Sequence, residues 1–376
     1  MDIIIIGGGI QGLCTAEYLS RQPGVQVSLV ERFGRQHHRG SSHGQTRITR
    51  STYSDALYVR LMQDAHQRLW PALERRVDSS LITAVQGCFF GPLQGIFPAY
   101  KQAIVTGGAA VEELSVAQAR QRFPMFQIND DDGVLLDHTA GMIHAQRCIA
   151  ALWRVLEQRG VRLLKDQVIA IEPDSLRLRL RTSTLQPDRL VVCAGPWAPD
   201  LFPQLLKSRV QVVRQFISYW RLREPILGRA PQYPVWVELG SDPTDNWYGL
   251  PDSNGEGIKV ARHCLVGDDD PELDLQTVSP LELARIRLWM VRRMQVETES
   301  LAHTETCLYS VTGNEDFILD QHPDNDRLVI GAGFSGHGFK FGPVVGEILG
   351  QLVLEGGSEN ALFEENRRKY GAKNII

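Results

Sequence analysis

The chain of 376 residues has few cysteines, no long apolar run and little net charge, and each shortage excludes a class of protein. Its six cysteines are scattered without paired spacing, which argues against a disulfide framework or a zinc site and favours a reducing compartment. No apolar run approaches the ~20 residues that a membrane helix needs. The formal net charge of −4 provides no basic field for nucleic acid. We therefore expect a cytoplasmic protein with no metal site and no membrane or nucleic-acid partner.

A glycine-rich turn follows the first predicted strand. Residues 2–6 are apolar, and the glycines at 7, 9 and 12 then give G-x-G-x-x-G spacing at the start of a predicted helix. A second strand is predicted over residues 25–30, and Glu31 at its end lies 22 positions after Gly9. Such glycines let a pyrophosphate approach a helix N-terminus, while the acid binds a ribose hydroxyl. The pattern predicts dinucleotide binding without distinguishing NAD from FAD; a turn that serves only packing is the alternative.

A second glycine-rich turn lies near the other end of the chain. The run Val329–Phe341 indicates a buried strand, a turn with four glycines and the start of a helix that continues through Val344 and Leu352. The glycines allow close approach of the backbone to a flat or anionic group. His337 and Lys340 add polar groups to the same turn. Two such turns at opposite ends of one chain predict a single large cofactor that is bound from both sides.

The segments between these turns predict an α/β fold with α+β character and two interleaved domains. The expected elements are a helix from Asp55, a strand over Gly87–Pro98, helices over Ser115–Phe123 and Gly141–Gly160, strands over 167–171 and 189–197, then a second sheet from 210 to 263 and a helix over 280–294. The nucleotide-binding fold is expected to resume at Cys307. This assigns residues 1–80, 144–208 and 305–376 to a nucleotide-binding domain, and 81–143 and 209–304 to a substrate domain.

The residues around the second turn resemble one known family. The motifs are Cys307-Leu-Tyr-Ser-Val-Thr, Asp316-Phe-Ile-Leu-Asp and Gly333-Phe-Ser-Gly-His-Gly-Phe-Lys-Phe, and His43–Arg50 and Trp247–Pro251 are similar as well. The family is that of monomeric sarcosine oxidase and N-methyltryptophan oxidase, and the match covers essentially the whole chain. It implies a Rossmann-like FAD-binding domain of the glutathione-reductase and D-amino-acid-oxidase type, interleaved with a mixed-sheet substrate domain.

The resemblance also implies a reaction and a set of site residues. FAD would be attached through its 8α-methyl group to Cys307, the C–N bond of a small secondary amino acid would be oxidised, and dioxygen would be reduced to hydrogen peroxide. Arg50, Lys340 and Tyr248 are implied to bind the substrate, and the implied catalytic set is Lys259, His263, Arg47, Tyr309 and His337. The residues implied to bind FAD are Gly7, Gly9, Ile10, Gln11, Gly12, Glu31, Arg32, His43, Thr46, Arg47, Val168, Ala194, Gly195, Trp197, Cys307, Gly333, Gly336, His337, Gly338 and Lys340. We expect a monomer.

Four of these side chains would bring like charges to one cavity: Arg47, Arg50, Lys259 and Lys340. Buried like charges are costly unless an anion is present. A carboxylate about 4 Å from a cation gains roughly 4 kcal/mol at an effective dielectric near 20, so two such contacts can hold a small amino acid. We also expect the cations to lower the pKa of the Cys307 thiol.

The chain departs from the family pattern at three places, and other functions stay open. Gln45 stands where the family usually carries aspartate, Ser42 stands where it often carries a second histidine, and the loop Asp252–Glu256 does not match in detail. One alternative is an FAD-dependent amino-acid dehydrogenase that uses another electron acceptor. The other is a nucleotide-binding module without activity. For two residues a non-functional role is the alternative. Cys307 would then be an ordinary buried thiol, and Lys259 would be a strand residue whose charged end reaches solvent.

Overall fold

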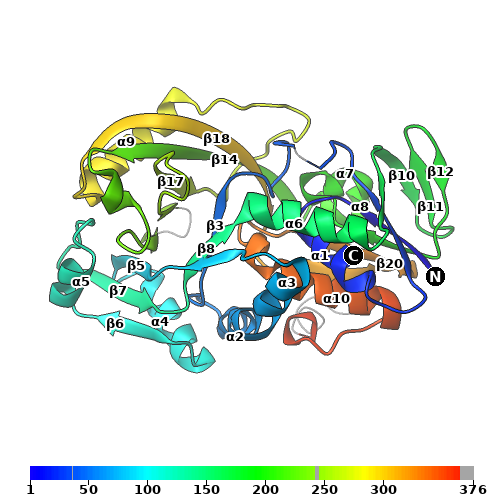
Figure 1. The fold of residues 1–376 in the computed structure, drawn as a ribbon, viewed down its shortest axis with the longest axis horizontal. Coiled ribbons are helices and arrows are strands. Elements are labelled where there is room, and N and C mark those ends of the chain that lie inside the picture. The colour runs from blue at the N-terminus through cyan, green and yellow to red at the C-terminus, as the bar shows by residue number, and fades with distance from the viewer. Residues whose placement is uncertain (36, 242–244, 365–376) are drawn as a thin grey trace.

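The computed structural model describes residues 1–35, 37–241 and 245–364 in two parts that two long strands connect. Strands β14 (Val210–Leu222) and β18 (Thr298–Thr312) lie side by side across the top of the molecule in Figure 1 and pair antiparallel along almost their whole length. Residues 242–244 of the predicted substrate domain, and 365–376 at the end of the predicted nucleotide-binding domain, lie outside the described residues.

The first part is built on a six-stranded sheet that brings the two glycine-rich turns together. Its order is β19 (Ile318–His322), β20 (Asn325–Ala332), β13 (Arg189–Val192), β1 (Asp2–Ile6), β2 (Gln26–Val30) and β9 (Arg162–Leu164). All neighbouring pairs except β19–β20 are parallel. The carboxyl ends of β1, β13 and β20 therefore lie at one edge, where open α/β sheets bind ligands. The predicted strands over residues 2–6 and 25–30 are confirmed.

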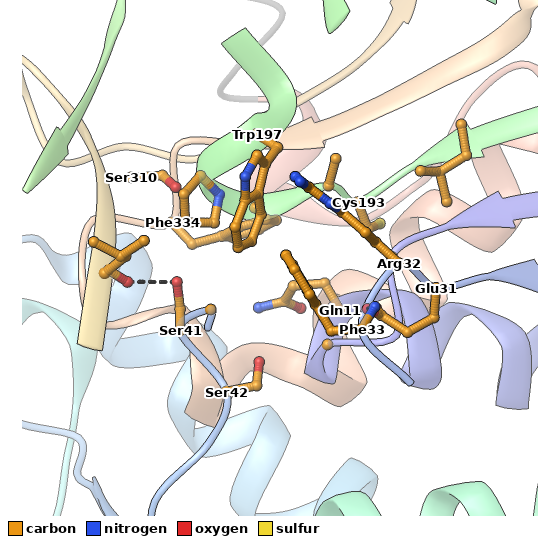
Figure 2. A pocket seen from close by; sticks show the side chains of 18 of the residues that line it. Gln11, Glu31, Arg32, Phe33, Ser41, Ser42, Cys193, Trp197, Ser310 and Phe334 are labelled. Carbon is orange, nitrogen blue, oxygen red and sulfur yellow. Dashed lines mark hydrogen bonds between the residues drawn. The ribbon is translucent and has the colours of Figure 1, made fainter. Parts of the chain in front are cut away.

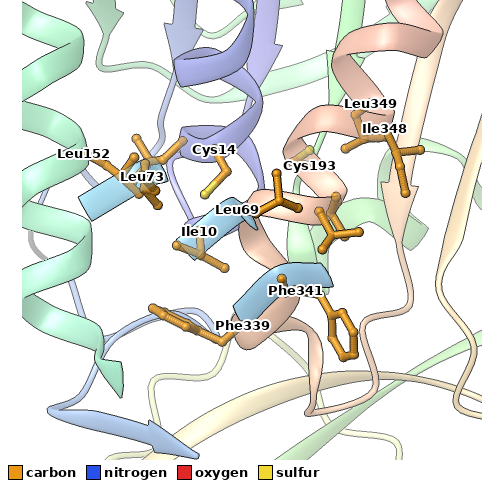
Figure 3. Packing of buried hydrophobic residues seen from close by; sticks show 14 of the residues in the cluster. Ile10, Cys14, Leu69, Leu73, Leu152, Cys193, Phe339, Phe341, Ile348 and Leu349 are labelled. Carbon is orange, nitrogen blue, oxygen red and sulfur yellow. The ribbon is translucent and has the colours of Figure 1, made fainter. Parts of the chain in front are cut away.

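Helices from distant segments cover one face of this sheet. They are α1 (Ile10–Leu19), α2 (Ala56–Asp64), the π-helical segment η1 (Ala65–Leu69), α3 (Trp70–Val77), α6 (Ala145–Gln158) and α10 (Gly342–Glu355). Figure 3 shows Ile10 and Cys14 of α1, Leu73 of α3 and Ile348 of α10 in one buried cluster. Asp55 caps α2, as the predicted helix start requires. The helix becomes a π-helix over η1, just before Pro71. Pro71 lies in the first turn of α3, where its missing N–H costs no hydrogen bond within α3.

The second part is built on an eight-stranded sheet with an outer helix. Its order is β18, β14, β17 (Ile258–His263), β16 (Asn246–Leu250), β15 (Val235–Glu238), β5 (Gly87–Pro92), β7 (Asp132–Asp137) and β6 (Val111–Leu114). Helices α4 (Phe97–Gly107), α5 (Val116–Arg122) and α9 (Pro280–Arg293) belong to this part. The remaining elements are the sheet β3 (Thr46–Thr49), β8 (Gly141–His144) and β4 (Ile82–Ala84), the sheet β10 (Val168–Glu172), β11 (Arg177–Leu180) and β12 (Thr184–Leu185), and the short helices α7 (Ala198–Leu201) and α8 (Pro203–Leu206).

The structure corrects three predicted elements. The strand expected over Gly87–Pro98 ends at Pro92, and α4 begins at Phe97. The helix expected over Gly141–Gly160 starts only at Ala145, because β8 first pairs with β3 and β4. Cys307 does not return the chain to the six-stranded sheet: it lies in β18 of the eight-stranded sheet, because β18 stays paired with β14 up to Thr312. The chain re-enters the six-stranded sheet at β19, and the domain boundaries stay a prediction.

The cysteines and the helices bear on the expectations that we drew from the composition. All six cysteines lie in the described part of the chain, and each is free. Among the described residues, no helix is long and apolar enough to cross a bilayer.

Candidate active site

The first cavity follows the edge of the six-stranded sheet where the glycine-rich turns meet. Its volume is about 440 Å³. Figure 2 shows Ser41 and Ser310 on one side of it and Glu31 and Arg32 on the other. The predicted cofactor residues that line it are Gly7, Gly9, Ile10, Gln11, Glu31, Arg32, Arg47, Val168, Ala194, Gly195, Trp197, Gly336 and Gly338.

The first turn requires glycine and fixes the acid at the end of β2. Gly7 has a φ of 103°, and a Cβ there would lie 2.2 Å from the carbonyl oxygen of Cys193, so no other residue fits. Glu31 is buried, and its carboxylate accepts hydrogen bonds from the Gly8 and Phe33 N–H groups at 2.7 Å each. The acid is thereby held beside the turn, at the position that the dinucleotide-binding pattern reserves for a ribose hydroxyl.

Unpaired polar atoms in the first cavity fit a large polar ligand. Gln11 donates its Nε2–H to the Gly338 carbonyl at 2.9 Å, which ties the first turn to the second. Its Oε1, like Ser310 Oγ, is buried without a hydrogen-bond partner among the described residues. Because buried polar groups are nearly always paired, these atoms suit a ligand with its own donors.

The second cavity adjoins the first and has a volume of about 470 Å³. Arg47, Tyr309, Gly336 and Phe339 line both cavities, so the two share one wall. The predicted site residues that line the second cavity are Thr46, Arg47, Arg50, Tyr248, Lys259, His263, Cys307, Tyr309, Gly336, His337 and Lys340. The structure therefore gathers the whole predicted catalytic and substrate-binding set around one space.

The four predicted cations of this cavity are held by main-chain carbonyls. Arg47 donates to the carbonyls of Ser41, His43 and Thr46, and Lys259 Nζ donates to Thr46 O at 3.2 Å. Lys340 Nζ donates to His337 O at 3.1 Å, and Arg50 donates to Thr52 O. In the part of the chain that the structure describes, none of the four forms an ion pair with a carboxylate within 4 Å. An anionic ligand would therefore supply a direct partner for these cations.

Burial and mutual repulsion lower the pKa values of the two lysines. Lys259 is 2 % exposed, and burial, followed by the charge of Arg47, lowers its pKa to about 8. The pKa of Lys340 falls well below its ordinary value for the same first reason, with Arg50 and Arg47 adding to the effect. A bound anion would favour the charged form of both side chains.

Comparison with known proteins identifies the family. The chain matches the family model described as FAD dependent oxidoreductase over residues 2–352. The chain belongs to this family. It is 35% identical to peroxisomal sarcosine oxidase of Mus musculus, with 94% of this chain and 92% of the relative covered. It is 30% identical to monomeric sarcosine oxidase of Bacillus sp. (strain B-0618), with 97% and 96% covered. The predicted resemblance is thus confirmed at the level of the family.

The fold agrees with that of a solved relative. The open form of NikD, an unusual amino acid oxidase essential for nikkomycin biosynthesis, superposes with a TM-score of 0.82 at 23% identity, covering 95% of each chain. This confirms the predicted mixed α/β fold of a flavoenzyme. FAD is therefore the dinucleotide that the first cavity of this FAD-dependent oxidoreductase is expected to hold.

Cys307 lines the second cavity, and the residues that follow it, Leu308 and Tyr309, line the first. Cys307 sits on β18 and is 5 % exposed. Burial raises its pKa, and the nearby charges of Arg47 and Lys259, which lower it, do not compensate. The surrounding cations thus lower the pKa of Cys307, as predicted, but the net shift is upward because burial has the larger effect.

One side of the second cavity contains two histidines and two tyrosines from the predicted set. Burial lowers the pKa of His337 to about 3, so this imidazole is neutral; its Nε2 lies 2.9 Å from Glu315 O. His263 Nε2 lies 3.6 Å from the Glu315 carboxylate. Burial raises the pKa of Tyr248 to about 12 and raises that of Tyr309 as well, so both phenols keep their protons.

Three predicted cofactor residues line neither of these cavities. Gly12 packs its backbone against Gly7 O in the first turn of α1, and Gly333 (φ 65°) turns the chain after β20. His43 Nε2–H donates to Thr306 O at 2.8 Å, and the side chain lines a separate third cavity.

Some site residues were missed by sequence reasoning. Glu315 lines the second cavity and meets both histidines, and Tyr53, Tyr58 and Tyr100 supply aromatic wall. The Arg50 guanidinium lies 4.4 Å from the Tyr53 ring centroid. Of these four residues, only Glu315 could have been found from the sequence, because it lies between two of the motifs that carry the family resemblance.

Of the three expected departures from the family pattern, Ser42 lines the first cavity, and the other two touch each other. Gln45 donates to the Glu256 carboxylate and accepts from Ser253 Oγ at 3.5 Å, so it holds the loop Asp252–Glu256. Ser42 Oγ accepts the Ile10 N–H at 3.0 Å, at the start of α1. Each departure therefore has a defined structural role in this chain.

Proposed function

We propose that the protein is a flavin-dependent oxidase that oxidises the C–N bond of a small secondary amino acid, N-methylated or cyclic, and reduces dioxygen to hydrogen peroxide. The observation that carries the proposal is the second cavity: it contains four cations without a carboxylate partner among the described residues, and it shares a wall with the dinucleotide cavity. The printed activities of the relatives, sarcosine oxidases, agree with this substrate class.

Arg50 and Lys340 are assigned to the substrate carboxylate. Both line the second cavity, and both are held by main-chain carbonyls that leave further donors available. An anion between them would replace their mutual repulsion by two charge-assisted hydrogen bonds. Burial lowers the pKa of Lys340, and a bound carboxylate favours the charged form of this lysine.

The surrounding charge also selects the reactive form of the amine. The cations disfavour an ammonium group, and neutral His337 and the protonated phenols of Tyr248 and Tyr309 offer hydrogen bonds to a neutral amine. His263, paired with Glu315, lines the same wall. The substrate is thus bound in the state from which its C–N bond can be oxidised to an imine, which water then hydrolyses.

When bound, FAD supplies the redox chemistry, taking two electrons from the C–N bond and delivering them to dioxygen. Lys259 is assigned to the oxygen reaction. Its pKa of about 8 leaves it mainly charged at neutral pH, and a fixed cation stabilises negative charge that develops on dioxygen. Arg47, which lines both cavities, contributes a second fixed charge.

The proposal also covers the attachment of FAD, the domain boundaries, the oligomeric state and the cellular location. FAD is attached through Cys307, and the residues of the first cavity named above hold the dinucleotide. Residues 1–80, 144–208 and 305–376 form the FAD-binding domain, and 81–143 and 209–304 the substrate domain, with β18 crossing between them. The protein acts as a monomer, in keeping with the printed name of the Bacillus relative. Its proposed location is the cytoplasm.

Two measurements test the function. The purified protein should be yellow, and it should release hydrogen peroxide with at least one of sarcosine, other N-methyl amino acids, pipecolate or proline. Flavin reduction by one of these compounds without peroxide release would instead establish a dehydrogenase with another acceptor. A protein that binds no flavin would refute both enzymes.

A further inference from the structure

The segment between β17 and α9 crosses from the eight-stranded sheet to the FAD cavity. We call residues 264–279 the strap; it contains no helix or strand. Near its middle, Glu272 lines the first cavity together with Arg32 and Trp197, which come from the six-stranded part of the molecule. The strap therefore completes the wall of a cavity that is otherwise built by the other part of the chain.

The root of the strap is fixed by buried groups. Asp269 accepts the Arg214 N–H at 2.8 Å and donates its own N–H to Val212 O at 2.8 Å, both on β14. The buried Arg214 guanidinium donates to Leu273 O at 2.9 Å and Asp270 O at 3.3 Å. These contacts hold the strap to the sheet without reference to a cofactor.

The tip of the strap is held by exposed groups of the FAD-binding part. Arg32 forms a two-pronged ion pair with the Glu272 carboxylate at 2.5 and 2.7 Å, and the Trp197 indole N–H donates to the same carboxylate at 2.8 Å. Arg39 donates to Glu272 O at 2.7 Å. The side chains of Arg32 and Glu272 are 29 % and 47 % exposed, so water competes for their ion pair. Exposed ion pairs contribute at most about 1 kcal/mol each. The contacts of Glu272 can therefore break while Arg214 still holds Asp270 and Leu273 on either side of it.

The side chains that Glu272 holds stand at the adenosine end of the cavity. Arg32 directly follows Glu31, the acid at the ribose position, and its guanidinium lies 4.8 Å from the Phe33 ring centroid. Phe33 in turn lies 5.2 Å from the Trp197 ring. Figure 2 shows Trp197, Arg32 and Phe33 converging at this end. A single carboxylate from the other part of the molecule fixes two members of this group.

We propose that the strap is a closure for bound FAD and that Glu272 is its latch, a positioning residue that holds Arg32 and Trp197 in place and slows release of the dinucleotide. The latch acts on cofactor retention rather than on the reaction at the other cavity. Since it depends on FAD binding alone, it stands or falls independently of the substrate proposed above.

The test is the rate of FAD release in a Cys307→Ser background, in which FAD is free to dissociate whichever way the natural protein holds it. Release after dilution is followed by flavin fluorescence. Glu272→Gln should raise the rate about fivefold to tenfold, because an ion pair and the geometry of the indole hydrogen bond are both weakened. Added salt should speed release from the parent but not from Glu272→Gln. In a double-mutant cycle with Arg32→Gln, the two effects should not add.

The matched control is Asp268→Asn, which makes the same change of charge in the same strap. Asp268 is exposed and makes no side-chain hydrogen bond or ion pair among the described residues. A release rate for Glu272→Gln equal to that of Asp268→Asn would overturn the proposal. So would a matching loss of thermal stability in the flavin-free Glu272→Gln protein, which would indicate a purely structural ion pair.

Discussion

Replacement of Lys259 by methionine should make the protein more stable while removing a functional charge. Lys259 is 2 % exposed, and the acceptor of its Nζ–H is Thr46 O at 3.2 Å. Burial, and then the charge of Arg47, lower its pKa from 10.5 to about 8. The folded protein thus holds this cation at a cost, and a methionine of similar length removes it.

The size and the pH dependence of the effect follow from this shift. A pKa that falls from 10.5 to about 8 corresponds to roughly 3 kcal/mol of instability at pH 7. Loss of the hydrogen bond to Thr46 O offsets about 1 kcal/mol, so Lys259→Met should raise the free energy of unfolding by about 2 kcal/mol. Between pH 8 and 10.5 the unfolded chain binds more protons than the folded one, so the stability of the parent rises with pH. The advantage of the variant should therefore shrink and disappear across this window.

The assay is urea denaturation of the two proteins at matched flavin content, at several pH values from 7 to about 10. Leu250→Met, a change to methionine at a buried residue paired with Lys259 in the sheet, is the control and should show no such pH dependence. A variant less stable than the parent at pH 7, or a difference that does not change with pH, would refute the assignment of Lys259 as a buried, destabilising cation.

The remaining predictions concern the cofactor and the substrate. Lys259→Met should keep anaerobic flavin reduction by substrate but slow reoxidation by dioxygen by orders of magnitude in stopped-flow traces; wild-type reoxidation would exclude the oxygen role. Arg50→Ala and Lys340→Ala should each raise the KM for carboxylate substrates about tenfold or more, and an unchanged KM would remove that residue from carboxylate binding. Glu31→Ala should lower the flavin content of the purified protein, and normal loading would contradict the ribose assignment. Denatured wild-type protein should give a fluorescent band on a gel and Cys307→Ser none; any other pair of results means that Cys307 is not the attachment point.

The sheet that carries the first cavity was predictable because its signals are local. β1 and β2 are short apolar runs bounded by glycine or a turn, and such runs are typical of buried strands. The elements that were misread depend on distant partners. β8 forms because residues 141–144 pair with β3, some 95 positions earlier, and nothing within Gly141–His144 shows this pairing. The long strand β18 likewise extends past Cys307 only because β14 remains beside it.

The candidate site was predictable in its membership but not in its energetics. Arg50 and Lys340 lie far apart in the sequence, and a family resemblance rather than a pattern of residues placed them together. The sequence shows which cations are near Cys307, but not the burial that raises the pKa of its thiol. Glu272 had no signal at all, because its role arises from an ion pair with Arg32 across 240 positions.

The contact between Gln45 and Glu256 gives a physical reason for two departures from the family pattern at once. Gln45 donates from its amide nitrogen to the Glu256 carboxylate and accepts from Ser253 with its amide oxygen. An aspartate, which we expect the family to carry at this position, would bring a second negative charge close to Glu256, and nearby like charges disfavour each other. The neutral amide suits both neighbours, so the glutamine and the loop Asp252–Glu256 belong together as one local solution. The loop therefore explains the residue at position 45 without any loss of the four cations on which the proposed chemistry depends.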